Sequence, residues 1–304
     1  MSLLVVGSVA FDAVKTPHGN IDRMLGGSAS YFAVAASYFT PVRVVGVVGD
    51  DFTDEHHDVF LQRGICTEGI ERVTGKTFFW SGEYSPNMND RTTLDTQLNV
   101  FATFEPKLPE HYRQSPYLFL GNIDPELQTR VQKQMADPKL VAGDTMNFWI
   151  EGKREHLIET LKGMHALIIN DSEARLLSGE WNLAKAAKAV RRMGPHTVVI
   201  KRGDNGATIY QDGHIFSAPA LPLEVVHDPT GAGDSFAGGF MGYLSSLPPT
   251  KAAIAPNDLR RAVIYGSVMG SFTVEQFGLE RLRHLKREEI DQRFREFQDL
   301  TQFE

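Results

Sequence analysis

The chain has 304 residues, of which 42% are hydrophobic and 23% are charged, and its net charge is −7. This composition is typical of a globular protein that buries a sizeable core. The negative charge argues against nucleic acid as a partner, because binding its phosphates requires clustered Lys and Arg. The single cysteine, Cys66, excludes an intrachain disulfide and a cysteine-based metal site.

The N-terminal apolar segment has no basic lead, and Asp12 interrupts it far short of a membrane-spanning length. It therefore predicts a first strand, and we expect no membrane partner and a reducing, cytoplasmic location.

Short apolar runs alternate with helical patterns along most of the chain. Strands are predicted at Leu3–Val6, Val42–Val48, Tyr117–Leu120, Leu140–Gly143, Ala166–Ile169 and Thr197–Ile200. Helices are predicted at about 29–39, 53–62, 125–136, 153–163, 173–178, 183–193, 258–274 and 286–298. Ser28 is expected to cap the first helix, and residues 207–216 to form a hairpin with an Asp-Gly turn. This alternation predicts an α/β fold with a mostly parallel sheet covered by helices on both faces.

Residues from about 70 to 104 depart from this alternation. Strands are predicted at 77–84 and 98–104, split by a polar turn at 85–90 and without a helix between them. We interpret them as a small antiparallel lid, with strands from about 10–18 and 70–104, inserted into one domain that spans residues 1–304. An edge hairpin is the alternative.

The segment Asp228-Pro229-Thr230-Gly231-Ala232-Gly233-Asp234 lies between two β-branched residues, which predict the end of a strand, and an apolar helical run. Glycines ahead of a helix let a ligand approach the backbone, and the free N–H groups and helix dipole favour a phosphate. A carboxylate in such an anion hole is unfavourable unless it accepts a proton, so Asp234 is a candidate general base. A Gly-rich helix start with an Asp in its first turn is the alternative without a ligand.

Four segments in this order resemble the ribokinase (PfkB) family of sugar and nucleoside kinases. They are Gly26-Gly27-Ser28-Ala29, Asn170-Asp171-Ser172-Glu173, Lys201-Arg202-Gly203 with Gly206, and the segment Asp228–Asp234. The resemblance spans nearly the whole chain. It implies a ribokinase-like three-layer α/β/α fold with a small β lid, and ATP-dependent phosphorylation of an alcohol.

The resemblance also implies roles for these residues on the ATP side. Asp234 would take the proton of the acceptor hydroxyl, while amides of Gly231, Ala232 and Gly233 stabilise the transferred phosphoryl group. Residues expected along ATP are Asn170, Lys201, Gly203, Thr230, Gly231, Gly233 and Ser267, with Asp144 and Asn147 near the phosphates. Asn170 and Glu173 would hold Mg²⁺ through water, or form a capping box, or both. Some members bind a monovalent cation such as K⁺ near the turn that begins at Asp228.

The acceptor side is expected to comprise Asp12, Gly26, Gly27, Ser28 and Tyr31. A carboxylate such as Asp12 can accept two hydrogen bonds from a vicinal diol of a sugar or ribose. Tyr31 stands where sugar kinases often have Asn. The lid also carries aromatic residues, which suit stacking on a nucleobase or packing against the body or a second subunit's lid: Phe78, Phe79, Trp80 and Tyr84.

A small sugar is the leading expectation for the acceptor. A ribonucleoside, phosphorylated at its 5′-hydroxyl, is the alternative, and a non-catalytic sugar- or nucleotide-binding regulator is a third reading. A homodimer through the lid is a further expectation that the family offers.

Overall fold

The computed structural model describes residues 2–248 and 254–302, and its centre is a nine-stranded sheet in the order β13-β12-β11-β10-β9-β8-β1-β4-β5. Seven strands are parallel: β1 (Leu3–Val6), β4 (Val42–Val48), β5 (Cys66–Arg72), β8 (Tyr117–Leu120), β9 (Leu140–Gly143), β10 (Ala166–Asn170) and β11 (Thr197–Lys201). The hairpin of β12 (Ala207–Gln211) and β13 (His214–Ala218) closes one edge in antiparallel pairing. The predicted α/β fold with a mostly parallel sheet is confirmed.

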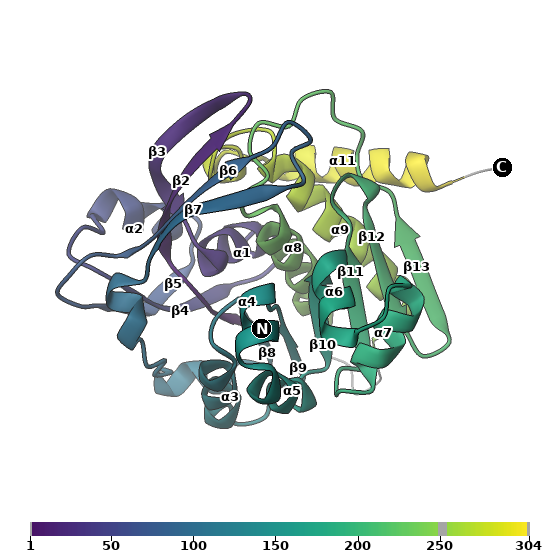
Figure 1. The fold of residues 1–304 in the computed structure, drawn as a ribbon, viewed down its shortest axis with the longest axis horizontal. Helices are drawn as coiled ribbons and strands as arrows, with labels where there is room; N and C mark the ends of the chain where they lie inside the picture. The colour runs from purple at the N-terminus through teal and green to yellow at the C-terminus, as the bar shows by residue number, and fades with distance from the viewer. Residues whose placement is uncertain (1, 249–253, 303–304) are drawn as a thin grey trace.

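Helices cover both faces of this sheet (Figure 1). They are α1 (Ser28–Ala36), α2 (Asp54–Leu61), α3 (Pro125–Gln134), α4 (Asn147–Gly152), α5 (Arg154–Lys162), α6 (Asp171–Ser178), α7 (Leu183–Arg191), α8 (Ala232–Ser246), α9 (Pro256–Thr273), α10 (Glu280–Arg283) and α11 (Arg287–Thr301). Short 3₁₀ turns are η1 (Asn99–Thr103), η2 (Glu110–Tyr112) and η3 (Gly203–Asn205). Among the described residues, the structure contains no helix that combines the length and apolarity needed to cross a membrane.

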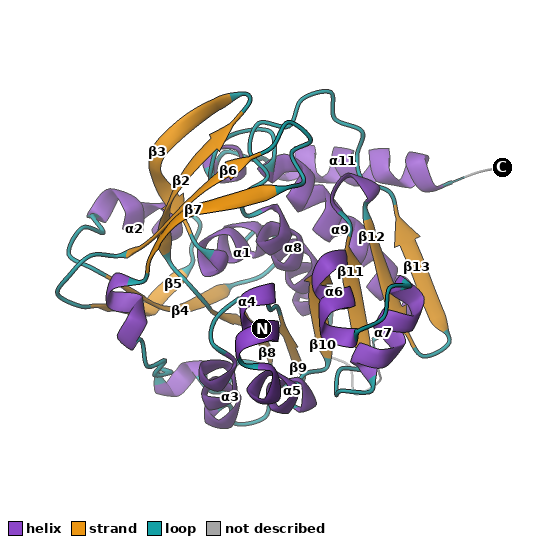
Figure 2. Ribbon diagram, viewed as in Figure 1, coloured by secondary structure: helices purple, strands orange, loops and turns teal. Residues whose placement is uncertain are grey.

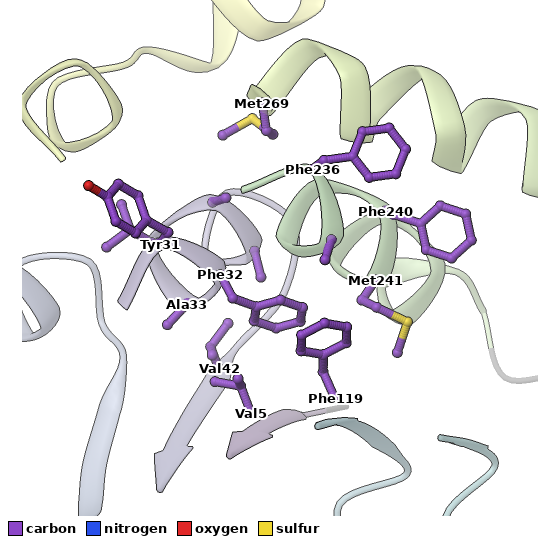
Figure 3. Packing of buried hydrophobic residues seen from close by; sticks show 14 of the residues in the cluster. Val5, Tyr31, Phe32, Ala33, Val42, Phe119, Phe236, Phe240, Met241 and Met269 are labelled. Carbon is purple, nitrogen blue, oxygen red and sulfur yellow. The ribbon is translucent and has the colours of Figure 1, made fainter. Parts of the chain in front are cut away.

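The core has two halves because the central strands are buried on both faces. In β1, Leu3 and Val5 point into one apolar cluster, and Leu4 and Val6 point into the other. Figure 3 shows the first cluster, where Phe32 of α1 stacks on Phe119 of β8 with ring centroids 4.2 Å apart. Helices α1, α8 and α9 pack together over this face. Their packing fixes the start of α8, where the candidate base lies.

A second sheet of four strands, in the order β3-β2-β6-β7, lies across one side of the main sheet (Figure 2). Its strands are β2 (Ala10–Thr16), β3 (Gly19–Gly26), β6 (Phe78–Tyr84) and β7 (Arg91–Gln97). The pairs β2–β3 and β6–β7 are antiparallel, and β2 and β6 are joined in parallel. This is the predicted lid sheet, and it includes β3 in addition to the expected segments.

Several predicted boundaries are wrong. Residues 98–104 form no strand: η1 begins at Asn99, which has φ of 50°, and Val100 and Phe104, four residues apart, are buried in the core. The second lid strand is instead β7. The lid segment does not begin at residue 70, because β5 runs to Arg72 within the main sheet.

Two further local predictions are wrong. Within the described residues, the stretch 219–231 contains no strand ahead of the Asp228 motif. Ser28 does not cap α1: Gly27 is the N-cap residue and makes no side-chain cap, while the Ser28 hydroxyl lies 3.2 Å from that of Ser8.

Candidate active site

The Asp228–Asp234 segment leads directly into α8. Gly231 is the N-cap residue and has φ of 74°, a conformation that favours glycine, and a Cβ there would lie 2.3 Å from the ring of Tyr31. The amide of Ala232 donates to the carbonyl of Pro229 (3.1 Å). In the described part of the chain, the amides of Gly231 and Gly233 donate to no other backbone group. Of the three predicted anion-hole amides, these two are therefore the ones left for a phosphate.

Asp234 lies in the first turn of α8, beside this free helix start. Burial and the nearby carboxylate of Asp144 raise the pKa of Asp234 from 3.8 to about 7, and Lys201 and Arg91 act in the opposite direction. A pKa close to neutral suits a group that must accept a proton and later release it.

Lys201, at the end of β11, brings a largely buried positive charge to the same place. Its Nζ lies 3.2 Å from Oδ2 of Asp144, and a Cβ on Gly233 would be 2.9 Å from that Nζ. Burial alone lowers the pKa of Lys201, but Asp144, Glu173 and Asp234 outweigh it, so the pKa is raised. The lysine is therefore held as a cation next to the candidate anion hole.

Asn170 and Glu173 form the predicted capping box at the start of α6. The Asn170 Oδ1 accepts from the amide of Glu173, and Glu173 Oε2 accepts from the amide of Asn170, both at 2.8 Å. Burial and the charge of Asp144 raise the pKa of Glu173 to about 7. The carboxylates of Asp144, which is buried, and Glu173, which is half-buried, together with the amide of Asn170, offer oxygen donors that fit a divalent cation such as Mg²⁺.

Asp228 is fully buried and ties the motif to the loop between α9 and α10. Its Oδ1 accepts from the amide of Thr230 (2.9 Å), and its Oδ2 accepts from the amide of Gly278 (3.1 Å). The Thr230 hydroxyl donates to Tyr84 of the lid (3.3 Å). Both residues thus position the turn, and a cation near Asp228 stays a prediction.

On the acceptor side, the sequence suggested that Asp12 ends the first strand, but this is wrong. Strand β1 ends at Val6, and Asp12 lies within strand β2 of the lid. A Cβ on Gly26 would lie 1.9 Å from its Oδ2, so only glycine leaves room for this carboxylate. Burial and Asp228 raise the pKa of Asp12 to about 7, against a hydrogen bond from the Gly27 amide. Gly27 itself has φ of 90° and packs against the backbone of Ser8.

Tyr31, another predicted acceptor residue, is deeply buried, with 1% of its surface exposed. Its hydroxyl is buried without a hydrogen-bond partner among the described residues. Burial, Asp12 and Asp228 raise its pKa well above the ordinary value. The phenol therefore stays neutral next to these carboxylates and can donate a hydrogen bond. Ser28, by contrast, is engaged with Ser8.

The lid contributes residues that the sequence did not single out. Arg91 hydrogen-bonds to Tyr84 and acts electrostatically on Asp12 and Asp234 from the exposed start of β7. The Asn89 side chain closes over Gly203, which has φ of 54°: a Cβ there would lie 2.4 Å from Asn89 Oδ1. No motif marks either lid residue, and only the register of β6 with β7 places them.

The remaining expected positions are less closely tied to this cluster. Ser267 lies on α9, about one turn before Gly270. A Cβ on Gly270 would lie 3.3 Å from the carbonyl oxygen of Ala232 in α8. Asn147 begins α4 and is exposed. Tyr265, two residues before Ser267, is half-buried and packs between Tyr243 and Phe294.

Comparisons with known proteins extend over nearly the entire chain. The family model described as pfkB family carbohydrate kinase matches residues 2–283. A nucleoside kinase from Methanothermobacter thermautotrophicus is 38% identical over 300 residues, covering 91% of each chain. A cytidine kinase from Thermococcus kodakarensis is 29% identical over 255 residues, covering 82% of this chain and 90% of that protein. The solved structure of a Burkholderia thailandensis nucleoside kinase with inosine has a TM-score of 0.78 at 20% identity, with 97% of both chains covered.

Proposed function

Because the chain belongs to the pfkB family of carbohydrate kinases, we propose that it transfers the γ-phosphoryl group of ATP to the 5′-hydroxyl of a ribonucleoside. The expected class, a kinase of sugars or nucleosides, is confirmed by the family match and the named relatives. Between the two acceptors, the comparisons favour the nucleoside, which the sequence alone placed second. The intact glycines and Asp234 argue against a non-catalytic regulator.

The observation that carries the nucleoside reading is the pairing of Asp12 with Trp80. They are register partners in the parallel strands β2 and β6, so their side chains share one face of the lid. A Cβ on Gly82 would lie 2.2 Å from the Trp80 ring, so the half-buried indole lies flat over the strand. A carboxylate for the ribose diol thus stands beside an aromatic surface for the base.

The proposed reaction needs few groups. Asp234 takes the proton of the 5′-hydroxyl as the new O–P bond forms and the bond from Pγ to the ADP oxygen breaks. The free amides of Gly231 and Gly233 stabilise the charge on the transferred group, and Lys201 adds a largely buried cation. Asp12 and Tyr31 orient the ribose.

Mg²⁺, held through water by Asn170 and Glu173, would neutralise charge on the ATP phosphates. A K⁺ ion near Asp228 would be a second bound cation. The nucleotide would run along Thr230, Gly203 and Ser267. We place the enzyme in the cytoplasm, where ATP is available.

The test is an ATP-dependent phosphorylation screen of sugars and ribonucleosides. We expect turnover of at least one ribonucleoside with kcat/KM at least about tenfold above any sugar, because base stacking contributes about 1–3 kcal/mol. Trp80→Leu should raise KM for the nucleoside about tenfold or more and leave turnover of a poor sugar substrate unchanged. Trp181→Leu, at a tryptophan that is 85% exposed on the body, is the matched control. Turnover of sugars alone would overturn the nucleoside proposal and leave the kinase assignment intact.

A further inference from the structure

Three metal-binding side chains meet at the edge of the main sheet, away from the kinase site. Cys66 and Glu68 belong to the edge strand β5, and His111 belongs to η2. One ligand atom from each lies within 4.8 Å of the other two. Cys66 is the first residue of β5, whereas the loops of the candidate active site follow the ends of the parallel strands.

We propose that Cys66, Glu68 and His111 form a binding site for a Zn²⁺-like divalent ion. Thiolate, imidazole and carboxylate are the donors that Zn²⁺ selects, and three protein ligands leave one tetrahedral position for water. In such a site, neighbouring ligand atoms lie roughly 3.3–3.6 Å apart. His111 Nε2 already lies 3.5 Å from Glu68 Oε2. Glu68 and His111 are exposed, so small rotations of their side chains would bring both ligand atoms equally near the sulfur of Cys66.

The surroundings hold these donors in place. The Tyr112 hydroxyl donates to Cys66 Sγ at 3.0 Å, a contact of the kind that orients a metal-bound thiolate. Arg43 Nη1 donates to the carbonyl of His111 (2.6 Å), which ties η2 to strand β4. The register of β4 and β5 shifts between Arg43 and Val45, and such a bulge re-aims the side chains of the edge strand.

The sequence led to the expectation that a single cysteine excludes any cysteine-based metal site, and the proposed site restricts that exclusion. That expectation holds for sites with several cysteines, but a mixed site needs only one thiolate. The bound ion would clamp the outermost parallel strand to the turn beside it, and would protect an edge that has no further strand in the described chain.

Cobalt titration of the reduced protein tests the proposal, because Cys66 is the chain's single thiol. We expect a sulfur-to-cobalt charge-transfer band that saturates at one equivalent and that Zn²⁺ abolishes. Cys66→Ser should lose the band, and His111→Ala and Glu68→Gln should each weaken cobalt binding about tenfold or more. Circular dichroism should verify that each variant is folded.

The matched control is His156→Ala. His156 is also an exposed histidine beside a glutamate, with its Nε2 3.9 Å from Glu126, but it lies outside the cluster. It should leave the titration unchanged. Absence of the band in the wild-type protein would overturn the proposal. A band that is equally strong in His111→Ala and Glu68→Gln would also overturn it, because the metal would then be held by the thiol alone.

Discussion

Asp234 is a single side chain whose environment opposes its ionisation in the folded state. Its pKa is raised from 3.8 to about 7, chiefly by burial. The folded protein therefore holds this proton more tightly than the unfolded chain does. Between about pH 4 and pH 7 the unfolded state has released the proton and the folded state has not, so stability falls as the pH rises through this interval. Asp12 and Glu173 act in the same direction.

Asp234→Asn should therefore lower the activity of the enzyme while raising its stability above about pH 4. We expect kcat to fall by about 10²-fold or more, because the proposed general base is lost, while ATP binding persists. The melting temperature at pH 8 should rise above that of the wild type, and the difference should shrink toward pH 4, where both side chains are neutral. Steady-state kinetics and thermal unfolding across this pH range measure both effects.

Asp299→Asn is the control for this experiment, since Asp299 is exposed on α11. It should change neither quantity. Near-wild-type turnover of Asp234→Asn would show that another group takes the proton.

The lid sheet contacts the body at both sides of the candidate site. Tyr84 of β6 accepts from Thr230, Asn89 covers Gly203, and the ring of His18 in the β2–β3 turn lies 5.4 Å from that of His227. Arg91 begins β7 between these contacts. Its guanidinium acts on the carboxyl groups of Asp144 and Asp234, where the phosphoryl group would pass.

Arg91→Ala should therefore lower kcat about tenfold or more, since it removes a positive charge that acts on Asp144 and Asp234, beside the proposed path of the phosphoryl group. Arg91→Lys should restore part of the rate. Lys15→Ala removes another cation of the same sheet, which pairs with Glu83 at 2.8 Å, and should leave kcat unchanged. Steady-state kinetics of the three variants decides the role of Arg91, and equal rates for Arg91→Ala and Lys15→Ala would contradict it.

The sequence predicted those elements whose surroundings are uniform. Strands β1, β8 and β9 are buried on both faces, so their apolar runs coincide with their observed bounds. Strand β7 was missed because all its residues are exposed and most are polar, so it shows no apolar alternation. The apolar stretch 98–104 predicts a strand, but it contains the 3₁₀ turn η1. Val100 and Phe104 lie four residues apart, a spacing that puts both side chains on the buried side of this turn.

The candidate site was predictable to a similar extent. Gly231, Gly233 and Asp234 share one short motif, and Asn170 with Glu173 has the spacing of a capping box. The contributions of Arg91 and Asn89 depend on where a hairpin folds back over the body. Such a long-range contact leaves no local pattern in the chain.

The position of the lid leaves one of its edges uncovered. Among the residues that the structure describes, strand β7 pairs only with β6, and all seven of its residues are exposed, including Leu94 at 56%. An unpaired edge presents a row of free N–H and C=O groups to another strand. We therefore expect two copies to associate through their lids, with β7 at the contact.

Sedimentation equilibrium or light scattering at micromolar concentrations measures this association. Thr93→Pro removes a backbone N–H from β7, and Leu94→Glu places a charge on the exposed edge. Either change should shift the dimer toward monomer, and acceptor KM should rise because Asp12 and Trp80 belong to the same sheet. Leu300→Glu, at a leucine that is 45% exposed on α11, should leave both properties unchanged. A wild-type protein that stays monomeric, or a dimer that persists in both β7 variants, would place the contact elsewhere or remove it.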